Sequence, residues 1–282
     1  MTVRSHLYVP ANNLDRLVKA IDRGADSLII DLEDGVAPAE KDLARENLTQ
    51  FLDECSTSVQ IWVRVNSERK WLERDLEAAI NQNCSGIVLA KTSSPSDLES
   101  LDSMIRELEV SRGIIETIDV SALIESATGI LNVRSISKAP RVSRLQLGET
   151  DLRADLGITT LLDETSLQFA RSMAVFASAA AGIDSPVAAV STNFSDLEAF
   201  RRSTQEYKSW GFFGRACIHP SQVPIVNEVF TPSDEEVAAA QEIIDLLSDS
   251  GGGVAVDSRG HMIDEAVAKI ARRTLSARRS EN

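Results

Sequence analysis

The stretch IDVSALIESATGILNVRSISKAPRVSRLQLGETDLRAD, residues 118–155, decides the fold of this chain. It contains two apolar runs, VSALI and LQL, and each run is followed by an acid, Glu125 in the first case and Asp151 in the second. The segment between them, Ala127–Ala139, has apolar residues at helical spacing. A strand, a helix and a second strand in this order place both strand ends on one edge of a parallel sheet. We therefore expect Glu125 and Asp151 to face each other at that edge.

Outward from this stretch, short apolar runs alternate with amphipathic segments along the whole chain. Continuous apolar runs are expected in strands that are buried on both faces of a sheet. Eight strand–helix units within residues 1–232 predict an α/β fold, a closed (β/α)8 TIM barrel that forms the catalytic domain. Residues 233–282 are expected to form a helical extension that packs on the barrel or on a neighbouring subunit. The expected strands are Leu7–Val9, Ser27–Leu32, Gln60–Val65, Gly86–Leu89, Val120–Ile124, Leu145–Leu147, Val187–Val190 and Arg215–Ile218.

Composition excludes several classes of protein. The chain has 282 residues, of which 43% are hydrophobic and 26% charged, which predicts a soluble globule with a sizeable core. Its formal net charge of −14 argues against a general nucleic-acid binder, although a local basic pocket can still hold a phosphorylated ligand. The cysteines Cys55, Cys84 and Cys217 show neither metal-ligand spacing nor a disulfide framework. With no signal-peptide run and no membrane-spanning stretch, we expect a cytoplasmic protein without a membrane partner.

Charged and polar residues follow most of the expected strands. Active sites of (β/α)8 barrels lie at the C-terminal ends of the strands, so these residues should meet at one rim. Acids and cations gathered on one rim are hard to attribute to packing, and they indicate an enzyme. The residues expected at the rim are Pro10, Asn12, Glu33, Asp34, Arg64, Asn66, Lys91, Glu125, Asp151 and His219. Of these, Asn12 and Lys91 are candidates for binding substrate.

Glu125 and Asp151 are the candidate metal ligands. Two carboxylates, with water and substrate oxygens in the other positions, suit Mg2+, with Mn2+ as an alternative ion. Zinc is disfavoured because neither His nor Cys accompanies the acids. The alternative is that one of the acids is a helix N-cap or a surface residue. Gly148 favours the functional interpretation, because a residue without a side chain leaves room for substrate.

Arg64 ends the expected strand Gln60–Val65, where its guanidinium could hold a carboxylate or stabilise an enolate oxygen. The alternative is an ion pair with Glu33 or Asp34 that serves only the rim. Both roles are compatible if these acids orient Arg64 and also hold metal-bound water. Lys91 could contact substrate or pair with a rim acid. Asp31 could point into the barrel or towards the helices, and the sequence leaves both cases open.

Seven stretches together resemble the citrate lyase β-subunit-like proteins of the HpcH/HpaI aldolase superfamily, along nearly the whole chain. Any one of them alone is a weak signal, but their order and spacing make the set specific. They are RSHLYVPA (4–11), DSLIIDLEDGVAPAEK (26–41), VRVN (63–66), LIESATG (123–129), LQLGETDLRADLG (145–157), GRACIHPSQ (214–222) and GHMID (260–264). The chain departs from the family at Ala11, where Gly is common, and at Ala90, where Pro is common. Both positions shape the mouth where substrate enters.

The resemblance implies a TIM barrel with a Mg2+ site, assembled as a trimer or a hexamer. It implies that Glu125 and Asp151 bind the metal and that Arg64 binds the substrate carboxylate or thioester oxygen. Glu33 and Asp34 would lie near the metal-bound waters. By position alone Asp264 is an N-cap. By resemblance it is also an acid/base residue that reaches a neighbouring subunit's site.

The reaction implied by the resemblance is cleavage or formation of a 3-hydroxyacyl-coenzyme A thioester. Malyl-, citramalyl- and citryl-CoA are the expected substrates, and acetyl-CoA and an oxo acid the expected products. One alternative is a citrate lyase β subunit that acts on a thioester of an acyl carrier protein. Another is an aldolase that acts on free oxo acids such as pyruvate. A third, from a different class, is a metal-binding scaffold without turnover.

Overall fold

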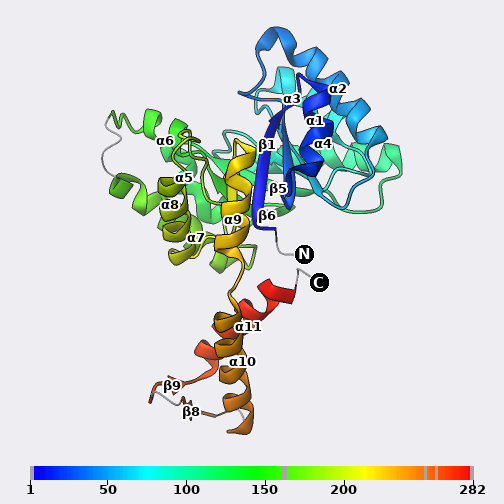
Figure 1. Ribbon diagram of the computed structural model, residues 1–282. Helices are drawn as coiled ribbons and strands as arrows, with labels where there is room; N and C mark the ends of the chain where they lie inside the picture. Colours follow the sequence, from blue (N-terminus) through cyan, green and yellow to red (C-terminus); the bar gives the residue numbers. More distant parts are fainter. Residues whose placement is uncertain (1–2, 160–163, 251–252, 258–259, 280–282) are drawn as a thin grey trace. The chain divides into compact units, whose positions relative to one another are not determined.

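The computed structural model describes residues 3–159, 164–250, 253–257 and 260–279 (Figure 1). The chain divides into two compact units, with the boundary between Asn227 and Glu228. The larger unit contains a parallel sheet and the helices around it. The smaller unit contains two long helices and a short hairpin.

The sheet of the larger unit has seven parallel strands in the order β6-β5-β4-β3-β2-β1-β7. Each strand from β1 to β5 pairs with the next one along the chain, and β7 returns to pair with β1, so the sheet is strongly curled. The strands are β1 (Ser5–Pro10), β2 (Ser27–Asp31), β3 (Gln60–Val65), β4 (Gly86–Leu89), β5 (Asp119–Ile124), β6 (Val142–Leu147) and β7 (Arg215–Cys217).

The gap between β6 and β7 is bridged by two residues rather than by a full strand. Val187 pairs with Gln146 of β6, and Ala188 pairs with Arg215 of β7, both in parallel. The predicted barrel is therefore confirmed, but the expected strand Val187–Val190 is reduced to these bridges. Pro186 contributes to this reduction, because it has no amide hydrogen to extend the ladder.

Side-chain caps and proline account for where several helices begin and end. Ser126 accepts a hydrogen bond from the amide of Gly129 and so caps α5. That helix ends at Ile136 and not at Ala139 as predicted, because Pro140 disfavours helical backbone at the residue before it. The helices are α1 (Leu14–Ala20), α2 (Lys41–Glu54), α3 (Arg69–Ala79), α4 (Pro95–Arg112), α5 (Ala127–Ile136), α6 (Glu149–Asp155), α7 (Gln168–Ala181), α8 (Leu197–Ser209) and α9 (Val223–Phe230). Short 3-10 turns lie at η1 (Ile21–Arg23), η2 (Pro38–Glu40), η3 (Glu164–Leu167) and η4 (Pro220–Gln222).

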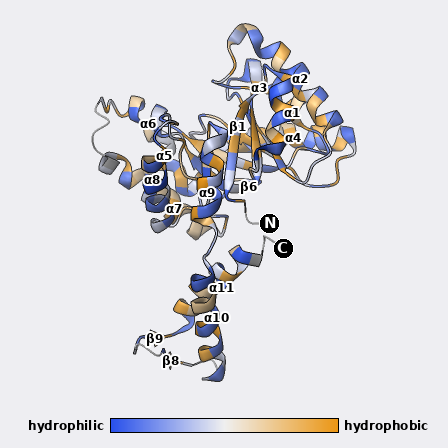
Figure 2. Ribbon diagram, in the orientation of Figure 1, coloured by the Kyte–Doolittle hydropathy of each residue, from blue (hydrophilic) through white to orange (hydrophobic). Residues whose placement is uncertain are grey.

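The strands are apolar along most of their length, as expected for a sheet covered on both faces (Figure 2). On the inner face, Ile29, Trp62, Val88 and Leu123 form a buried cluster on which Tyr8 packs. Because side chains alternate along a strand, the residue two positions further on shares this face. This alternation leads from Ile29 to Asp31, from Trp62 to Arg64 and from Leu123 to Glu125. The apolar cluster is thus the floor beneath the charged rim.

The smaller unit has its own small core. It contains α10 (Asp234–Asp249), the antiparallel hairpin β8 (Ala255–Val256) and β9 (Met262–Ile263), and α11 (Glu265–Arg279). Leu247, Ile263 and Ala268 are buried at its centre. Among the described helices of both units, none is both long and apolar enough to cross a membrane.

Candidate active site

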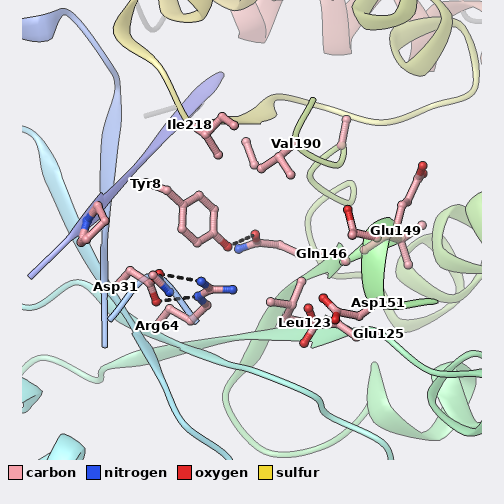
Figure 3. A pocket seen from close by; sticks show the side chains of 17 residues that line it. Tyr8, Asp31, Arg64, Leu123, Glu125, Gln146, Glu149, Asp151, Val190 and Ile218 are labelled. Atoms are coloured by element: carbon pink, nitrogen blue, oxygen red, sulfur yellow. Dashed lines mark hydrogen bonds and ion pairs between the residues drawn. The ribbon is translucent and has the colours of Figure 1, made fainter. Parts of the chain in front are cut away.

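A cavity of about 280 Å3 lies at the C-terminal ends of the barrel strands (Figure 3). Its walls combine apolar side chains with four acids, one arginine and backbone of the segment that follows β6. The lining residues are Tyr8, Pro10, Asp31, Gly35, Arg64, Leu123, Glu125, Gln146, Leu147, Gly148, Glu149, Thr150, Asp151, Ala188, Val190, Ala216 and Ile218. The rim predicted from the sequence therefore contains a cavity that holds both candidate metal ligands and Arg64.

Arg64 and Asp31 form a two-pronged ion pair on the cavity wall. Arg64 Nε donates to Asp31 Oδ1 at 2.7 Å and Nη2 donates to Oδ2 at 2.6 Å. Asp31 and Arg64 are partners in the register of β2 and β3, so strand pairing places them side by side. Asp31 also accepts from the amides of Glu33 and Gly35 at 2.9 Å each. Burial alone would lower the pKa of Arg64, but the hydrogen bonds and charge of Asp31 raise it, so the guanidinium stays a cation.

A second set of charges lies beside this pair and outside the cavity lining. Arg64 Nη1 is 3.2 Å from Glu33 Oε2. Lys91 Nζ donates to Glu33 Oε1 and lies 3.3 Å from Asp34 Oδ1. Burial raises the pKa of Glu33; it would also raise that of Asp34, but the contacts of Asp34 with Glu33 and Lys91 lower it. Lys91 thus pairs with rim acids, which is one of the two roles that the sequence left open.

Glu125 directly follows β5 and is buried, with 6% of its surface exposed. Its Oε2 accepts a hydrogen bond from the backbone amide of Lys91 at 2.8 Å. Lys91 has φ +52°, a left-handed conformation that is uncommon for a residue with a side chain. Burial, assisted by the negative charges of Asp151 and Glu33, raises the pKa of Glu125 to about 7. Burial thus opposes ionisation of this carboxylate, and the charge of Arg64 offsets that effect only in part.

Gly148 and Asp151 belong to the segment that follows β6. A Cβ atom at Gly148 would lie 2.5 Å from Glu125 Cγ and 2.8 Å from Cδ, so only glycine fits this close approach. Asp151 lies in the first turn of α6, is exposed and lines the cavity. Figure 3 shows the Glu125 and Asp151 side chains next to each other. Asp151 forms no hydrogen bond or ion pair with any described residue.

The four acids of the cavity divide into two paired and two unpaired groups. Asp31 pairs with Arg64, and Glu149 pairs with Arg171. Glu125 and Asp151 have no ion pair within the described part of the chain. Two neighbouring carboxylates without a counter-ion fit a hard divalent cation that prefers oxygen ligands, as Mg2+ does. No three His, Cys, Asp or Glu side chains of the described residues come together as a metal site. Water and substrate oxygens would thus complete the coordination.

Three other rim candidates do not line this cavity. Asn12 donates to Glu40 at 2.9 Å. Asn66 is buried and donates to the carbonyl of Leu32 at 2.9 Å. His219 caps the short turn η4 that follows it. The rim residues that were predicted from the sequence therefore do not all surround one cavity.

Asp264 lies in the smaller unit, immediately before α11. Its Oδ1 accepts a hydrogen bond from the amide of Val267 at 3.0 Å. Asp264 is therefore an N-cap of α11, in agreement with its place in the sequence. An N-cap carboxylate remains available for other chemistry, so capping and an acid/base role are compatible.

Three residues of the cavity were not singled out from the sequence. Tyr8 donates to Gln146 Oε1 at 3.1 Å, and Gln146 donates to Ser121 at 3.0 Å. Glu149 is held by Arg171. A polar Gln146 inside the run LQL was a signal for an inward-facing position, because every second residue of a strand shares one face. The partner of Glu149 lies 22 residues further along the chain, and no sequence pattern indicates the pairing.

The chain is similar to known proteins over most of its length. The model of the family HpcH/HpaI aldolase/citrate lyase matches residues 4–220. Citrate lyase subunit beta of Leuconostoc mesenteroides subsp. cremoris is 33% identical over 279 residues, covering 96% of this chain and 92% of that protein. A (3S)-malyl-CoA thioesterase of Cereibacter sphaeroides is 33% identical over 278 residues, covering 97% and 93%. The crystal structure of CitE from Mycobacterium tuberculosis in complex with magnesium, acetoacetate and coenzyme A has a TM-score of 0.80 and 29% identity, covering 98% of both chains.

Proposed function

Because the chain belongs to the HpcH/HpaI aldolase/citrate lyase family, we propose that it is a Mg2+-dependent carbon–carbon lyase of 3-hydroxyacyl-CoA thioesters. Malyl-, citramalyl- or citryl-CoA would be cleaved to acetyl-CoA and an oxo acid, or formed from them. The observation that carries this proposal is the pair of unpaired carboxylates, Glu125 and Asp151, in one cavity with Arg64. Relatives that carry the names of a lyase subunit and of a malyl-CoA thioesterase support this substrate class.

Glu125 and Asp151 would hold Mg2+ or Mn2+, which supplies Lewis-acid polarisation of the substrate oxygen that becomes a carbonyl. Gly148 lets the backbone approach the carboxylate of Glu125 closely, and the amide of Lys91 fixes one of its oxygens. The charge of Lys91 also offsets that of Glu33 and Asp34. These two acids would hold water molecules at the rim. These contacts orient the pair of acids before any ligand arrives.

Arg64 would bind the anionic oxygen of the substrate. Its Nε and one hydrogen of Nη2 are used by Asp31, and Nη1 lies near Glu33, which leaves guanidinium hydrogens for a ligand. When the carbon–carbon bond breaks, negative charge develops on the thioester oxygen of the enolate. A guanidinium that is fixed in place and stays charged stabilises that oxygen without reorganisation.

Asp264 would protonate the enolate carbon, or remove that proton in the condensation direction. We propose that it acts in the site of a second copy of the chain, within a homotrimer or hexamer. Asp264→Asn should abolish proton exchange at the acetyl methyl group of acetyl-CoA while keeping the helix cap, since Asn caps as well as Asp does. Mixing this variant with Glu125→Gln should restore activity if subunits share sites. Unimpaired exchange in Asp264→Asn would reduce the residue to its capping role.

A second cavity favours a phosphorylated carrier over a free oxo acid. It measures about 650 Å3 and shares Tyr8 with the first cavity. Arg16, Lys19 and Arg23 line it against a single acid, Asp15. None of these three cations forms an ion pair with a described residue. In a chain of net charge −14, such a local excess of positive charge suits the phosphates of coenzyme A.

The test is the purified chain with Mg2+ and each thioester, followed by quantification of acetyl-CoA, oxo acid and free CoA. A lyase releases acetyl-CoA, whereas a thioesterase releases free CoA. Glu125→Gln and Asp151→Asn should each abolish Mg2+-dependent turnover with circular dichroism unchanged. Glu73→Gln is the matched control, because this exposed acid pairs with Arg69 on α3, outside the cavity lining. Full activity in either cavity variant would remove the metal assignment.

The same assay separates the alternatives. Activity only on a thioester of an acyl carrier protein would identify a citrate lyase β subunit. Cleavage of free hydroxy oxo acids, without any thioester, would identify an aldolase. Mg2+ binding without turnover of any of these compounds would identify a scaffold.

A further inference from the structure

Glu149 is the first residue of α6. In the sequence it lies between the two candidate metal ligands, Glu125 and Asp151. Its side chain lines the cavity and is 11% exposed. Arg171 Nε donates to Glu149 Oε1 at 2.6 Å and Nη2 donates to Oε2 at 2.5 Å. The hydroxyl of Tyr207 donates to Oε1 at 2.6 Å. Both oxygens of Glu149 are therefore occupied by protein donors.

The partners of Glu149 are themselves held firmly. The guanidinium of Arg171 lies 4.8 Å from the ring centroid of Tyr207 and 5.0 Å from that of Trp210. Arg171 is 2% exposed and Tyr207 is 4% exposed. A charge pair this deeply buried, with its guanidinium against two aromatic rings, has little freedom to move. We call Glu149, Arg171 and Tyr207 the α6 clamp; it ties α6 to α7 and α8.

The clamp acts on a helix whose first turn has no side-chain cap. Helix α6 has seven residues, and its N-cap, Gly148, offers no side chain to the first turn. Asp151 lies in that first turn, two residues after Glu149. Gly148, directly before this turn, lies so close to Glu125 that an added Cβ would come within 2.5 Å of Glu125 Cγ. Glu125 is held separately, by the amide of Lys91, so a shift of the first turn would move Asp151 relative to Glu125.

We propose that the α6 clamp positions Asp151 against Glu125 for the divalent cation, and that Glu149 is a positioning residue and not a ligand. The inference rests on the proposed function, because it concerns the same metal site. Glu149 differs in this respect from Asp151: Glu149 is a largely covered acid with an arginine partner, whereas Asp151 is exposed and has no partner among the described residues. Removing partners that orient ligands lowers metal affinity by about 10–100-fold in other sites.

The test uses Tyr207→Phe, which removes one hydroxyl and keeps the ring, and Glu149→Gln, which keeps the shape and removes the charge. Mg2+ affinity is measured by calorimetry, Mn2+ binding by electron paramagnetic resonance, and opening of α6 in the metal-free protein by hydrogen exchange. Ser203→Ala is the matched control. Ser203 lies on α8, one turn before Tyr207, and the change removes the hydrogen bond that its hydroxyl accepts from Arg215 of β7; no contact of Glu149 with a described residue involves it.

Tyr207→Phe and Glu149→Gln should each weaken Mg2+ binding about tenfold or more and speed exchange at the start of α6. Ser203→Ala should bind Mg2+ like the wild type. Wild-type affinity and exchange in both clamp variants would refute the clamp and leave the proposed function standing. Equal weakening in Ser203→Ala would also refute it, because the effect would then reflect α8 in general. A wild-type chain that binds neither ion would refute the proposed function and the clamp together.

Discussion

Gly148→Ala is the substitution that most directly tests the geometry of the carboxylate pair. The backbone at Gly148 has φ −94° and ψ 82°, so alanine introduces no left-handed strain and only the new Cβ matters. That atom would lie 2.5 Å from Glu125 Cγ, whereas carbon atoms in contact are about 3.5–4.0 Å apart, so roughly 1 Å of movement is required. Glu125 is buried and fixed by the amide of Lys91, so it has little room to retreat.

A displacement of about 1 Å in a catalytic constellation costs on the order of 100-fold in rate. Gly148→Ala should therefore lower kcat/KM of thioester cleavage about 100-fold, which corresponds to about 2.7 kcal/mol, and it should also weaken Mg2+ binding in calorimetry. Gly253→Ala is the control, since the nearest atom to its new Cβ is the carbonyl oxygen of Ser250 at 3.8 Å. The reasoning is refuted if Gly148→Ala keeps kcat/KM and Mg2+ affinity within about twofold of the wild type.

Three further predictions concern the cavity wall, the core and the pH dependence of stability. Asp31→Asn should lower kcat/KM roughly 10–100-fold in steady-state assays, because charge-assisted hydrogen bonds worth about 1.5–3 kcal/mol hold Arg64; unchanged kinetics would contradict this. Gly86→Ala should reduce the free energy of unfolding in urea by about 1–3 kcal/mol, since its Cβ would lie 2.5 Å from Trp62 Cε3; an unchanged midpoint would argue against this contact. Burial and the charge of Arg144 hold the pKa of His6 well below its usual 6.5. As the pH falls below 6.5, the unfolded chain therefore binds a proton that the folded chain does not, and the free energy of unfolding decreases. His6→Gln should remove that part of the acid destabilisation in urea titrations, at most about 1.4 kcal/mol per pH unit, and an identical pH profile would count against it.

Much of the barrel is visible in the sequence because its strands are unbroken apolar runs. In the stretch 118–155, β5 ends at Ile124 and β6 ends at Leu147, as the acids and glycine after them predict. Helix α6 was not predicted, because it is short and its N-cap, Gly148, has no side chain to signal a helix start. The seventh strand was overestimated, because an apolar run also describes a segment that forms only single bridges.

The partner of Arg64 shows where sequence reasoning about the site stops. The sequence offered Glu33 or Asp34, which follow the strand, whereas the structure pairs Arg64 with Asp31 at its end and only secondarily with Glu33. The deciding fact is the register of β2 against β3, which sets Asp31 opposite Arg64 on the inner face. Composition and spacing predict that acids and an arginine share a rim, but register and side-chain alternation select the contacts.

The distribution of charge in the cavity has a consequence for the proposed reaction. Asp31 already balances Arg64, and Glu149 already balances Arg171, so neither arginine brings a net positive charge to an incoming ligand. Glu125 and Asp151 add negative charge, which by itself repels the carboxylate of an oxo acid. A divalent cation held by these two acids would cancel their charge and make the cavity neutral. In the proposed lyase, substrate affinity therefore depends on the cation first, and Arg64 contributes orientation rather than net attraction.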